Sequence, residues 1–124
     1  MRSQGLRTVG YYTNELNKAK EWYSEVFETA PYFDEPYFDE PFYVGFNIGG
    51  YELGLMPAED GIAKGDNVLV YWAVDDAASA YNELLNKGAT AHQAPQDVGD
   101  GIMVATVKDP WGNILGLIYN PHFK

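Results

Sequence analysis

The stretch Asp109-Pro110-Trp111-Gly112-Asn113-Ile114-Leu115-Gly116-Leu117-Ile118 decides the fold, because part of it occurs twice in the chain. The earlier stretch Gly49-Gly50-Tyr51-Glu52-Leu53-Gly54-Leu55-Met56-Pro57 carries the same Leu-Gly-Leu core 62 residues upstream. The helical pattern that opens at Glu15 likewise recurs at Asp76, at an offset of 61 residues. Since half of the 124 residues is 62, the sequence predicts a tandem pair of one supersecondary unit.

The composition fits a single folded domain without a membrane span. With 124 residues, of which 46% are hydrophobic and 15% aromatic, the chain is long enough and apolar enough to bury a core. It contains no apolar run of the ~18 residues that a spanning helix needs. Residues 1–7 lack the apolar stretch of a signal peptide, so we expect a cytoplasmic protein.

Charge and side-chain chemistry exclude several classes of function. The formal net charge of −10 would repel nucleic acids and anionic membranes, whereas it would attract a cationic small molecule. The chain has no cysteine, which excludes disulfides, thiolate metal sites and cysteine nucleophiles. His92 and His122 are its only histidines, so a histidine-rich metal site is excluded too, and we expect both at the surface.

The first half of the chain predicts a strand, a helix and a hairpin. Residues 6–12 are rich in β-branched and aromatic side chains, and Thr13 or Asn14 is placed to cap a helix over about 15–28. An apolar stripe at helical spacing supports that helix: Leu16, Ala19, Tyr23, Val26 and Phe27. The hairpin is expected to pair residues 42–48 with 51–56 around Gly49-Gly50.

Between this helix and the hairpin, residues 31–40 repeat the word Pro-Tyr-Phe-Asp-Glu. An odd insert within a strand would exchange its two faces, so one copy must be taken up in a loop or bulge. The aromatic and acidic side chains of this segment suit either a solvated loop or a lid over a cavity.

The second half predicts the same order of elements. Residues 68–74 form a strand, and Asp75 or Asp76 caps a helix that ends at Gly88. The apolar stripe of this helix is Ala77, Ala80, Tyr81, Leu84 and Leu85. Further strands are expected at about 89–93, 102–108 and 114–119, and the polar residues 57–66 link the two halves.

Each half therefore has the pattern βαβββ, which predicts an α+β fold. Two tandem βαβββ units, at about residues 5–57 and 66–120 of a single domain 1–124, are expected to form a curved eight-stranded mixed sheet. The helices cover one face of this sheet, and the other face encloses a cavity.

Three phrases of the chain resemble the vicinal oxygen chelate superfamily, which contains glyoxalase I, extradiol dioxygenases and bleomycin-resistance proteins. They are Glu15-Leu16 with Ala19 and Trp22-Tyr23, then Ala73-Val74-Asp75-Asp76, and Asp109-Pro110-Trp111-Gly112-Asn113. The last phrase is explained by turn chemistry, because Asp109 can accept bonds from turn amides and Gly112 supplies a left-handed residue. The resemblance also implies a homodimer with pockets near the subunit contacts.

The resemblance implies metal ligands at four places where this chain has none. Metal-dependent members take one ligand from each opening strand and one from each closing strand, and these places map to Thr8, Leu69, Gly54 and Gly116. Divalent cations bind imidazole nitrogens or carboxylate oxygens, so we predict no metal and no cofactor. Glu52 lies two residues before Gly54 and shares its strand face, but a position on the rim or in solvent is the favoured interpretation of Glu52.

Strand alternation predicts which residues line the cavity: Thr8, Gly10, Tyr12, Glu52, Gly54, Met56, Leu69, Tyr71, Ala73, Ile114, Gly116 and Ile118, with Trp111 as an aromatic wall or a surface turn residue. Gly54 and Gly116 would leave open the space in which an ion and its ligands would otherwise lie. The alternate residues should form the core against the helices: Val9, Tyr11, Leu53, Leu55, Trp72, Leu115 and Leu117.

Three functions fit these observations. The first is a metal-independent binding protein for a cationic or aromatic small molecule, similar to the drug-sequestering resistance proteins of the family. The second is a glyoxalase-like lyase or related enzyme with a relocated or absent metal, in which Glu52 would be the general base. The third is a fold without a ligand that acts through protein contacts.

Overall fold

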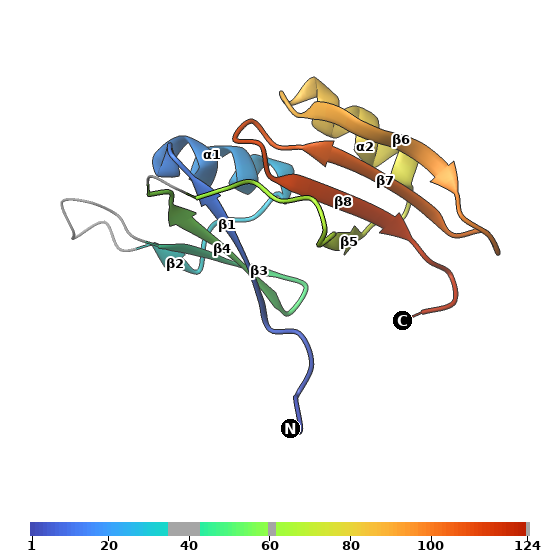
Figure 1. Ribbon diagram of the computed structural model, residues 1–124, viewed down its shortest axis with the longest axis horizontal. Coiled ribbons are helices and arrows are strands. Elements are labelled where there is room, and N and C mark those ends of the chain that lie inside the picture. Colours follow the sequence, from blue (N-terminus) through green and yellow to red (C-terminus); the bar gives the residue numbers. More distant parts are fainter. Residues whose placement is uncertain (35–42, 60–61, 124) are drawn as a thin grey trace. The chain divides into compact units, whose positions relative to one another are not determined.

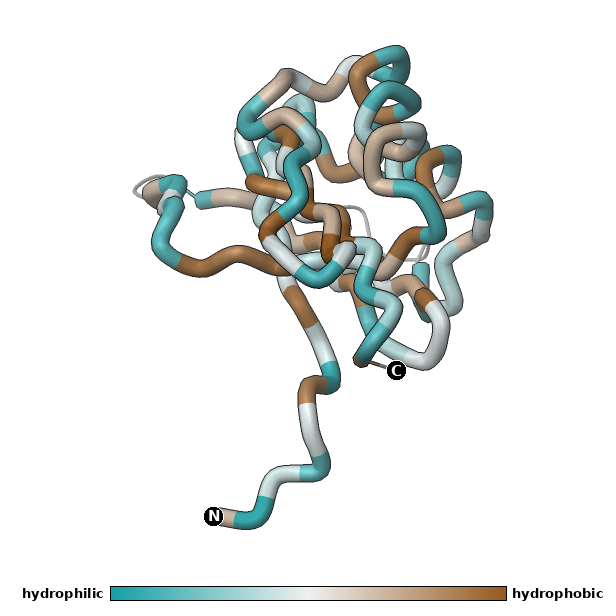
Figure 2. The backbone as a smooth tube through the Cα atoms, turned by 90° about the vertical axis from the view of Figure 1, so that its right-hand side faces the viewer, coloured by the Kyte–Doolittle hydropathy of each residue, from teal (hydrophilic) through white to brown (hydrophobic). Residues whose placement is uncertain are grey.

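The computed structural model describes residues 1–34, 43–59 and 62–123 (Figure 1). The chain divides into two compact units, the first unit Met1–Ile62 and the second unit Ala63–Lys124. Residues 1–7 have no regular structure and run away from the sheet of the first unit as an extended segment (Figure 1, Figure 2). No helix among the described residues is long and apolar enough to cross a membrane.

The first unit has the predicted βαβββ order. Its elements are β1 (Thr8–Thr13), α1 (Leu16–Val26), β2 (Phe33–Asp34), β3 (Val44–Ile48) and β4 (Tyr51–Pro57). They form a four-stranded sheet in the order β1-β4-β3-β2, in which β1 runs parallel to β4 and the other pairs are antiparallel. Helix α1 follows β1 and carries the chain back along the sheet, so that a later strand can run parallel to β1.

The second unit repeats this topology. Its elements are β5 (Tyr71–Ala73), α2 (Ala77–Asn86), β6 (Thr90–Asp97), β7 (Met103–Lys108) and β8 (Ile114–Tyr119). Their order in the sheet is β5-β8-β7-β6, again with one parallel pair, β5 with β8. The α+β fold of tandem βαβββ units is therefore confirmed, and its eight described strands are distributed over two four-stranded mixed sheets.

Most of the predicted core is buried between each helix and its sheet. In the first unit, Ala19 and Tyr23 on α1 and Leu53 and Leu55 on β4 have no exposed surface. The ring of Tyr11 lies 6.0 Å from that of Tyr23, so this side chain also faces α1. Leu115 and Leu117 are buried in the second unit, whereas the predicted core residues Val9 and Trp72 are only half-buried.

The helix caps follow local hydrogen bonding. Asp76 is the residue before α2, and its carboxylate accepts a hydrogen bond from the amide of Ser79 at 3.0 Å, as predicted for one of the two acidic candidates. Before α1, the hydroxyl of Thr13 accepts from the amide of Glu15 at 3.0 Å, but the cap position itself is Glu15. Helix α1 is accordingly shorter than the predicted range.

Both predicted hairpin turns form. Gly49 and Gly50 have φ angles of 60° and 93°, a left-handed conformation that two-residue hairpins require, and Asn47 accepts from the Gly50 amide. In the second unit, the buried Asp109 carboxylate accepts from the amides of Trp111 at 2.9 Å and Asn113 at 2.8 Å. The phrase at 109–113 is therefore scaffold, as its turn chemistry predicts.

Two strands differ from the prediction. Strand β5 begins at Tyr71 rather than Val68, and its pairing with β8 runs from Tyr71 to Ala73. Strand β6 is longer than predicted, and register shifts within β6 interrupt its pairing with β7. Of the duplicated segment 31–40, Phe33 and Asp34 pair with β3, and residues 35–40 lie outside the described residues, as does Phe42 of the predicted hairpin.

Candidate functional site

The candidate site lies on the face of the first unit's sheet that points away from α1, which we call the open face. Strand register fixes two neighbouring rows of side chains on this face. In the polar row, Glu52 on β4 is paired with Thr8 on β1 and with Asn47 on β3. In the glycine row, Gly54 is paired with Gly10 and with Gly45, so that three adjacent strands carry no side chain at the same level.

Three hydroxyl groups converge on the carboxylate of Glu52. The Thr8 hydroxyl donates to Oε1 at 2.7 Å, and the Tyr32 hydroxyl donates to Oε2. The Tyr43 hydroxyl is a further hydrogen-bonding partner of this carboxylate. The donors come from β1, from the segment between α1 and β2, and from the residue before β3, so they meet only in the folded unit.

These contacts shift the pKa values of all the titrating groups in the cluster. The hydrogen bond from Thr8, followed by that from Tyr32, lowers the pKa of Glu52 and outweighs the opposing effect of burial. The pKa of Tyr32 is raised, mainly by its hydrogen bond to Glu52. Burial first, and then the bond to Glu52, raises the pKa of Tyr43 to about 12. Glu52 is therefore an anion whose three partners are neutral at pH 7.

The glycine row is covered by neighbouring side chains. A Cβ placed on Gly54 would be 2.8 Å from both Cε1 and Cζ of Tyr43 and closer still to its hydroxyl. A Cβ on Gly45 would be 3.0 Å from the Tyr32 ring, and one on Gly10 would be 2.5 Å from the Met56 methyl group. We expected Gly54 to leave open space, and this expectation is wrong, because the bare backbone lets the Tyr43 ring lie directly on the sheet.

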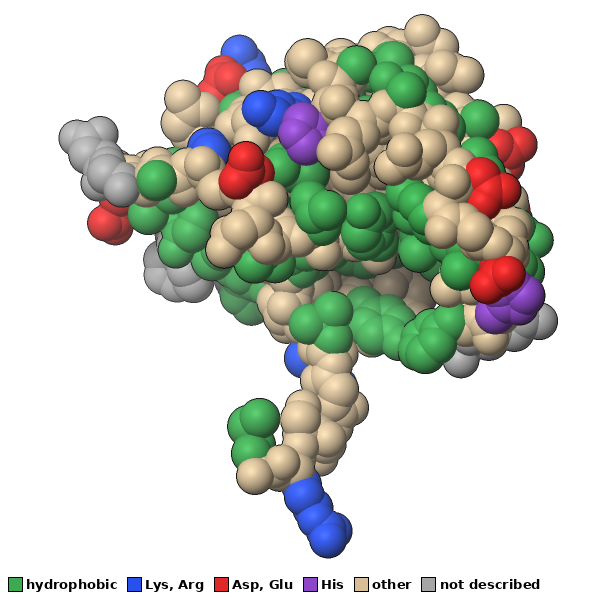
Figure 3. Space-filling model, turned by 45° about the vertical axis from the view of Figure 1, so that its right-hand side comes forward, with side chains coloured by type: hydrophobic (Ala, Val, Ile, Leu, Met, Phe, Trp, Pro, Cys, Tyr) green, Lys and Arg blue, Asp and Glu red, His purple; other side chains and the backbone are tan. Residues whose placement is uncertain are grey.

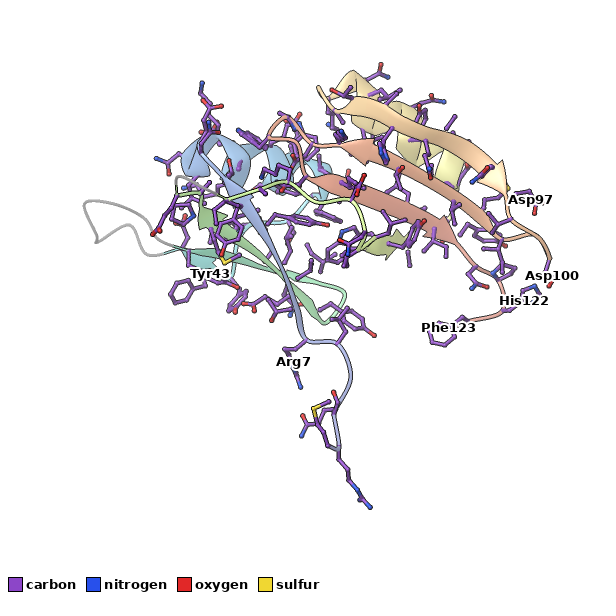
Figure 4. The ribbon with its side chains drawn as sticks, viewed as in Figure 1. Arg7, Tyr43, Asp97, Asp100, His122 and Phe123 are labelled. Atoms are coloured by element: carbon purple, nitrogen blue, oxygen red, sulfur yellow. The ribbon has the colours of Figure 1, made fainter. Side chains whose placement is uncertain are left out.

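A shallow pocket of ≈ 200 Å³ opens beside the polar row. It is lined by Arg7, Tyr32, Phe46, Asn47, Gly50, Tyr51 and Glu52. Figure 4 shows Tyr43 beside the strands of the first unit and Arg7 where the chain enters β1. The site therefore combines one anion, one cation at its edge and several aromatic rings.

The second unit has no such carboxylate at the equivalent place. Ile114 occupies the position that Glu52 has in the first unit, and Leu69 lies outside β5 with a largely exposed side chain. A Cβ on Gly116 would be 2.5 Å from the Val70 carbonyl oxygen and 2.8 Å from the Tyr71 ring, so this glycine leaves no open space either. The repeat has diverged, and the charged cluster belongs to the first unit alone among the described residues.

The other predicted lining residues have varied surroundings. Tyr12 is exposed at the far end of β1, and Met56 covers Gly10. Ile118 is half-buried on β8. Trp111 is half-buried in the turn between β7 and β8, where its amide donates to Asp109. The structure thus brings Thr8, Glu52 and Gly54 together within the first unit.

Sequence reasoning did not assign Tyr43 and Gly45 to the site, and it considered Tyr32 only as part of the segment 31–40, a solvated loop or a lid. Tyr43 and Gly45 could have been found, since both lie on one face of the predicted strand 42–48 and the hairpin places Gly45 opposite Gly54. Tyr32 precedes a strand, where no periodicity fixes the direction of a side chain.

The residues present do not fit a divalent cation at the four places that the resemblance implies. A threonine, a leucine and two glycines offer neither imidazole nor carboxylate. In the described parts of the chain, no three histidine, aspartate or glutamate side chains gather closely enough to hold a metal ion. His92 Nδ1 lies 2.8 Å from the Thr106 hydroxyl, and His122 Nε2 lies 2.8 Å from the Asp100 carbonyl oxygen.

On the face that Figure 3 shows, the acidic side chains of the described residues lie singly among apolar and uncharged groups and do not form one patch. Attraction of a cation to a specific place therefore depends on local charges such as Glu52, because charges more than a Debye length away, about 8 Å in physiological salt, are largely screened.

Comparison with protein families matches residues 5–117 to a single family model, described as the Glyoxalase/Bleomycin resistance protein/Dioxygenase superfamily. The match covers nearly the whole chain, including both units. A comparison with curated proteins found no significant match.

Several solved structures share the fold at low sequence identity. A superfamily member from Sphaerobacter thermophilus DSM 20745 has a TM-score of 0.75 and 20% identity, covering 95% of this chain and 98% of its own. A glyoxalase-related enzyme from Fulvimarina pelagi has a TM-score of 0.74 and 19% identity, covering 96% and 90%. TioX from Micromonospora sp. ML1 has a TM-score of 0.71 and 18% identity, covering 93% and 98%.

Proposed function

The chain belongs to the Glyoxalase/Bleomycin resistance protein/Dioxygenase superfamily, and from that premise we propose that it is a metal-independent binding protein for cationic small molecules. The observation that carries the proposal is the carboxylate of Glu52, which neutral hydroxyl groups of Thr8, Tyr32 and Tyr43 hold in its ionised form. The cationic group of the ligand would bind this carboxylate on the open face of the first unit.

The electrostatic support is that hydroxyl donors stabilise an anion without neutralising it. A carboxylate has about four lone-pair positions, and Thr8 and Tyr32 each donate to one of its oxygens, so it keeps acceptor capacity for a ligand. A cationic N–H group that uses this capacity forms a charge-assisted hydrogen bond, which is about twice as strong as a neutral one. The net charge of −10 adds a weak attraction of the same sign.

The surroundings of Glu52 favour an organic cation over a bare ion. The adjoining pocket of ≈ 200 Å³ is lined by Glu52 and by Tyr32, whose ring is exposed beside it. Aromatic faces attract organic cations, and one carboxylate with neutral oxygens is a poor set of ligands for a divalent metal. Arg7 at the pocket edge would select against ligands that carry a second positive charge near the first.

The same pKa shifts disfavour the enzymatic alternative. A general base works best when its pKa lies near the working pH, and catalytic glutamates are accordingly raised. The hydroxyl groups around Glu52 lower its pKa instead, so proton abstraction by this residue would be weakly driven. Binding is therefore the function that the cluster supports better.

Homodimerisation and a cytoplasmic location remain part of the proposal. Exposed aromatic side chains such as Tyr51 and Tyr119 support a subunit contact. Light scattering coupled to size-exclusion chromatography would test the dimer, and cell fractionation would test the location.

Calorimetric titration with benzamidine tests the function directly. This probe carries one amidinium cation, and its neutral isostere benzamide is the control ligand. We expect the wild type to bind benzamidine. Glu52→Gln should weaken this binding about tenfold, which corresponds to a loss of about 1.4 kcal/mol in binding free energy. Glu59→Gln, which removes an equal charge from an exposed position after β4, should change the affinity less than about twofold, because distant surface charges are screened.

Two outcomes would overturn the proposal. Equal binding of benzamide and benzamidine would remove the role of charge, and equal affinity in wild type and Glu52→Gln would remove the anchor. Metal analysis and native mass spectrometry of the untreated protein test whether the protein is independent of metal. A stoichiometric transition metal would contradict metal independence, while a retained organic cation would support the proposal.

A further inference from the structure

We infer that the glycine row is a subsite for a flat aromatic ring, and that the side chain of Tyr43 occupies this subsite until a ligand displaces it. The inference rests on the proposed function, because it extends the Glu52 anchor to a defined class of ligand. That class is a planar ring carrying a cationic N–H group, such as an aromatic amidine.

The first support is the geometry of the row. Gly10, Gly54 and Gly45 are paired directly across three adjacent strands. Neighbouring strands lie about 4.8 Å apart, so the row is a strip without Cβ atoms about 10 Å long, on which the Met56 methyl group covers the Gly10 end. A glycine within a strand often marks a close approach of a ligand or another chain segment, and three in register make a flat floor.

The second support is the side chain that covers this floor. A Cβ on Gly54 would be 2.8 Å from two atoms of the Tyr43 ring, and one on Gly45 would be 3.2 Å from its Cε2 atom. A six-membered ring therefore lies on the row, in a place where a methyl group does not fit. Phe33 borders this ring, with centroids 5.9 Å apart and planes at 63°.

The third support is that Tyr43 presents the chemistry expected of the ligand. Its ring lies on Gly54 while its hydroxyl binds the carboxylate of Glu52. An aromatic cation can make the same pair of contacts, with a flat ring on the glycine row and an N–H donor on Glu52. It replaces a hydroxyl donor by a positively charged N–H donor on the same carboxylate, so exchange of Tyr43 for such a ligand adds a Coulomb attraction at this atom.

The position of Tyr43 in the chain allows this exchange. Tyr43 comes before the first residue of β3, so its side chain is not fixed by the pairing of that strand. The glycines lie inside β1, β3 and β4, and Tyr43 is not among the paired residues of these strands. The floor therefore persists when the ring leaves.

A matched pair of probes separates the ring subsite from the anchor. Benzamidine and cyclohexanecarboxamidine carry the same cation, but only benzamidine has a flat ring. We expect Tyr43→Ala to bind benzamidine at least about fivefold more tightly than the wild type, because the competing occupant is removed. The affinity for the saturated probe should change less than about twofold, because its thicker ring gains little from the floor.

Two further variants control for other causes. Tyr43→Phe keeps the ring and removes the hydroxyl, so it should tighten the binding of benzamidine less than Tyr43→Ala does; tightening equal to that of Tyr43→Ala would assign the gain to the lost hydroxyl and overturn the inference. Adding Gly54→Ala to Tyr43→Ala places a methyl group on the floor, and it should reverse the gain for benzamidine while sparing the saturated probe.

The outcomes distinguish failure of this inference from failure of the proposed function. If Glu52→Gln weakens both probes but Tyr43→Ala leaves benzamidine binding unchanged or weaker, the anchor stands and the ring subsite is wrong. If Glu52→Gln weakens neither probe, the proposed function itself fails. A measurement on the wild type keeps the inference testable if the variants misfold. Benzamidine should shift the amide resonances of Gly45 and Gly54 more than the saturated probe does. Equal or absent shifts would overturn the inference of a ring subsite.

Discussion

The ring of Tyr43 lies on the backbone of Gly54, close enough that a Cβ at residue 54 would be 2.8 Å from its Cε1 and Cζ atoms. Tyr43 comes just before β3, and Gly54 lies in the middle of β4, the strand that pairs with β3. The glycine thus serves as the surface on which an aromatic side chain rests.

Gly54→Ala should push the Tyr43 ring off the sheet. Because the added methyl group overlaps ring atoms, we expect a loss of about 1–3 kcal/mol in the free energy of unfolding. Burial is the main cause that raises the pKa of Tyr43 to about 12, so this pKa should fall in the variant. Urea unfolding and NMR titration of labelled tyrosine measure the two effects.

Gly65→Ala is the control for this variant, because the nearest atom to a Cβ there is 3.7 Å away. It should leave both the stability and the Tyr43 titration close to those of the wild type. An unchanged pKa of Tyr43 in Gly54→Ala would contradict the proposed contact.

The contribution of Glu52 to stability should depend on pH. Its hydroxyl partners lower its pKa in the folded protein below the ordinary value of 4.5, so the folded state binds its proton less readily than the unfolded state. The stabilisation is therefore complete above about pH 4.5 and is lost as the pH falls through the folded pKa. Glu52→Gln should be less stable than the wild type at pH 7, and this difference should narrow in acid.

Urea unfolding of both proteins between pH 7 and pH 3 measures that difference. Glu59→Gln serves as the comparison, since Glu59 is an exposed glutamate after β4. If the difference in stability between the wild type and Glu52→Gln grows as the pH falls, the predicted pH dependence is wrong.

Asp76→Ala should destabilise α2. The Asp76 carboxylate accepts the Ser79 amide at the start of the helix, and loss of such a cap costs about 1 kcal/mol. Thermal unfolding would measure the loss. Asp75→Ala removes the same charge one residue earlier, outside the cap position, and a comparable loss in that variant would argue for a general charge effect rather than capping.

Asp109→Ala should lower the free energy of unfolding more than a substitution of a surface carboxylate does. The Asp109 side chain is buried and accepts bonds from the Trp111 amide and from the backbone and side-chain nitrogens of Asn113. Because hydrogen bonds to a charged group contribute about 1.5–3 kcal/mol, we expect a loss of about 3 kcal/mol or more in the free energy of unfolding. Asp97→Ala, which removes an exposed carboxylate bound to the Gly99 amide, should cost about 1 kcal/mol or less.

The sequence by itself determined the elements and their duplication. The Leu-Gly-Leu cores of β4 and β8 occupy equivalent strands, and the apolar stripes of α1 and α2 face their sheets, because helical and strand periodicity are local properties of the chain. The turn at Asp109 was also predictable, since its donors and acceptor lie within five residues. Capping by Asp76 followed from the same local chemistry.

Only the tertiary structure decided how the candidate site is built. Tyr32 and Glu52 are 20 residues apart, and Thr8 and Glu52 are 44 apart, so no local pattern predicts that their side chains meet. The meeting depends on the register of β1 and β3 against β4, which aligns the polar row and the glycine row. Strand register is set by packing of distant segments, and for that physical reason the sequence could place Glu52 and Gly54 on one face but could not show that Tyr32 and Tyr43 meet them there.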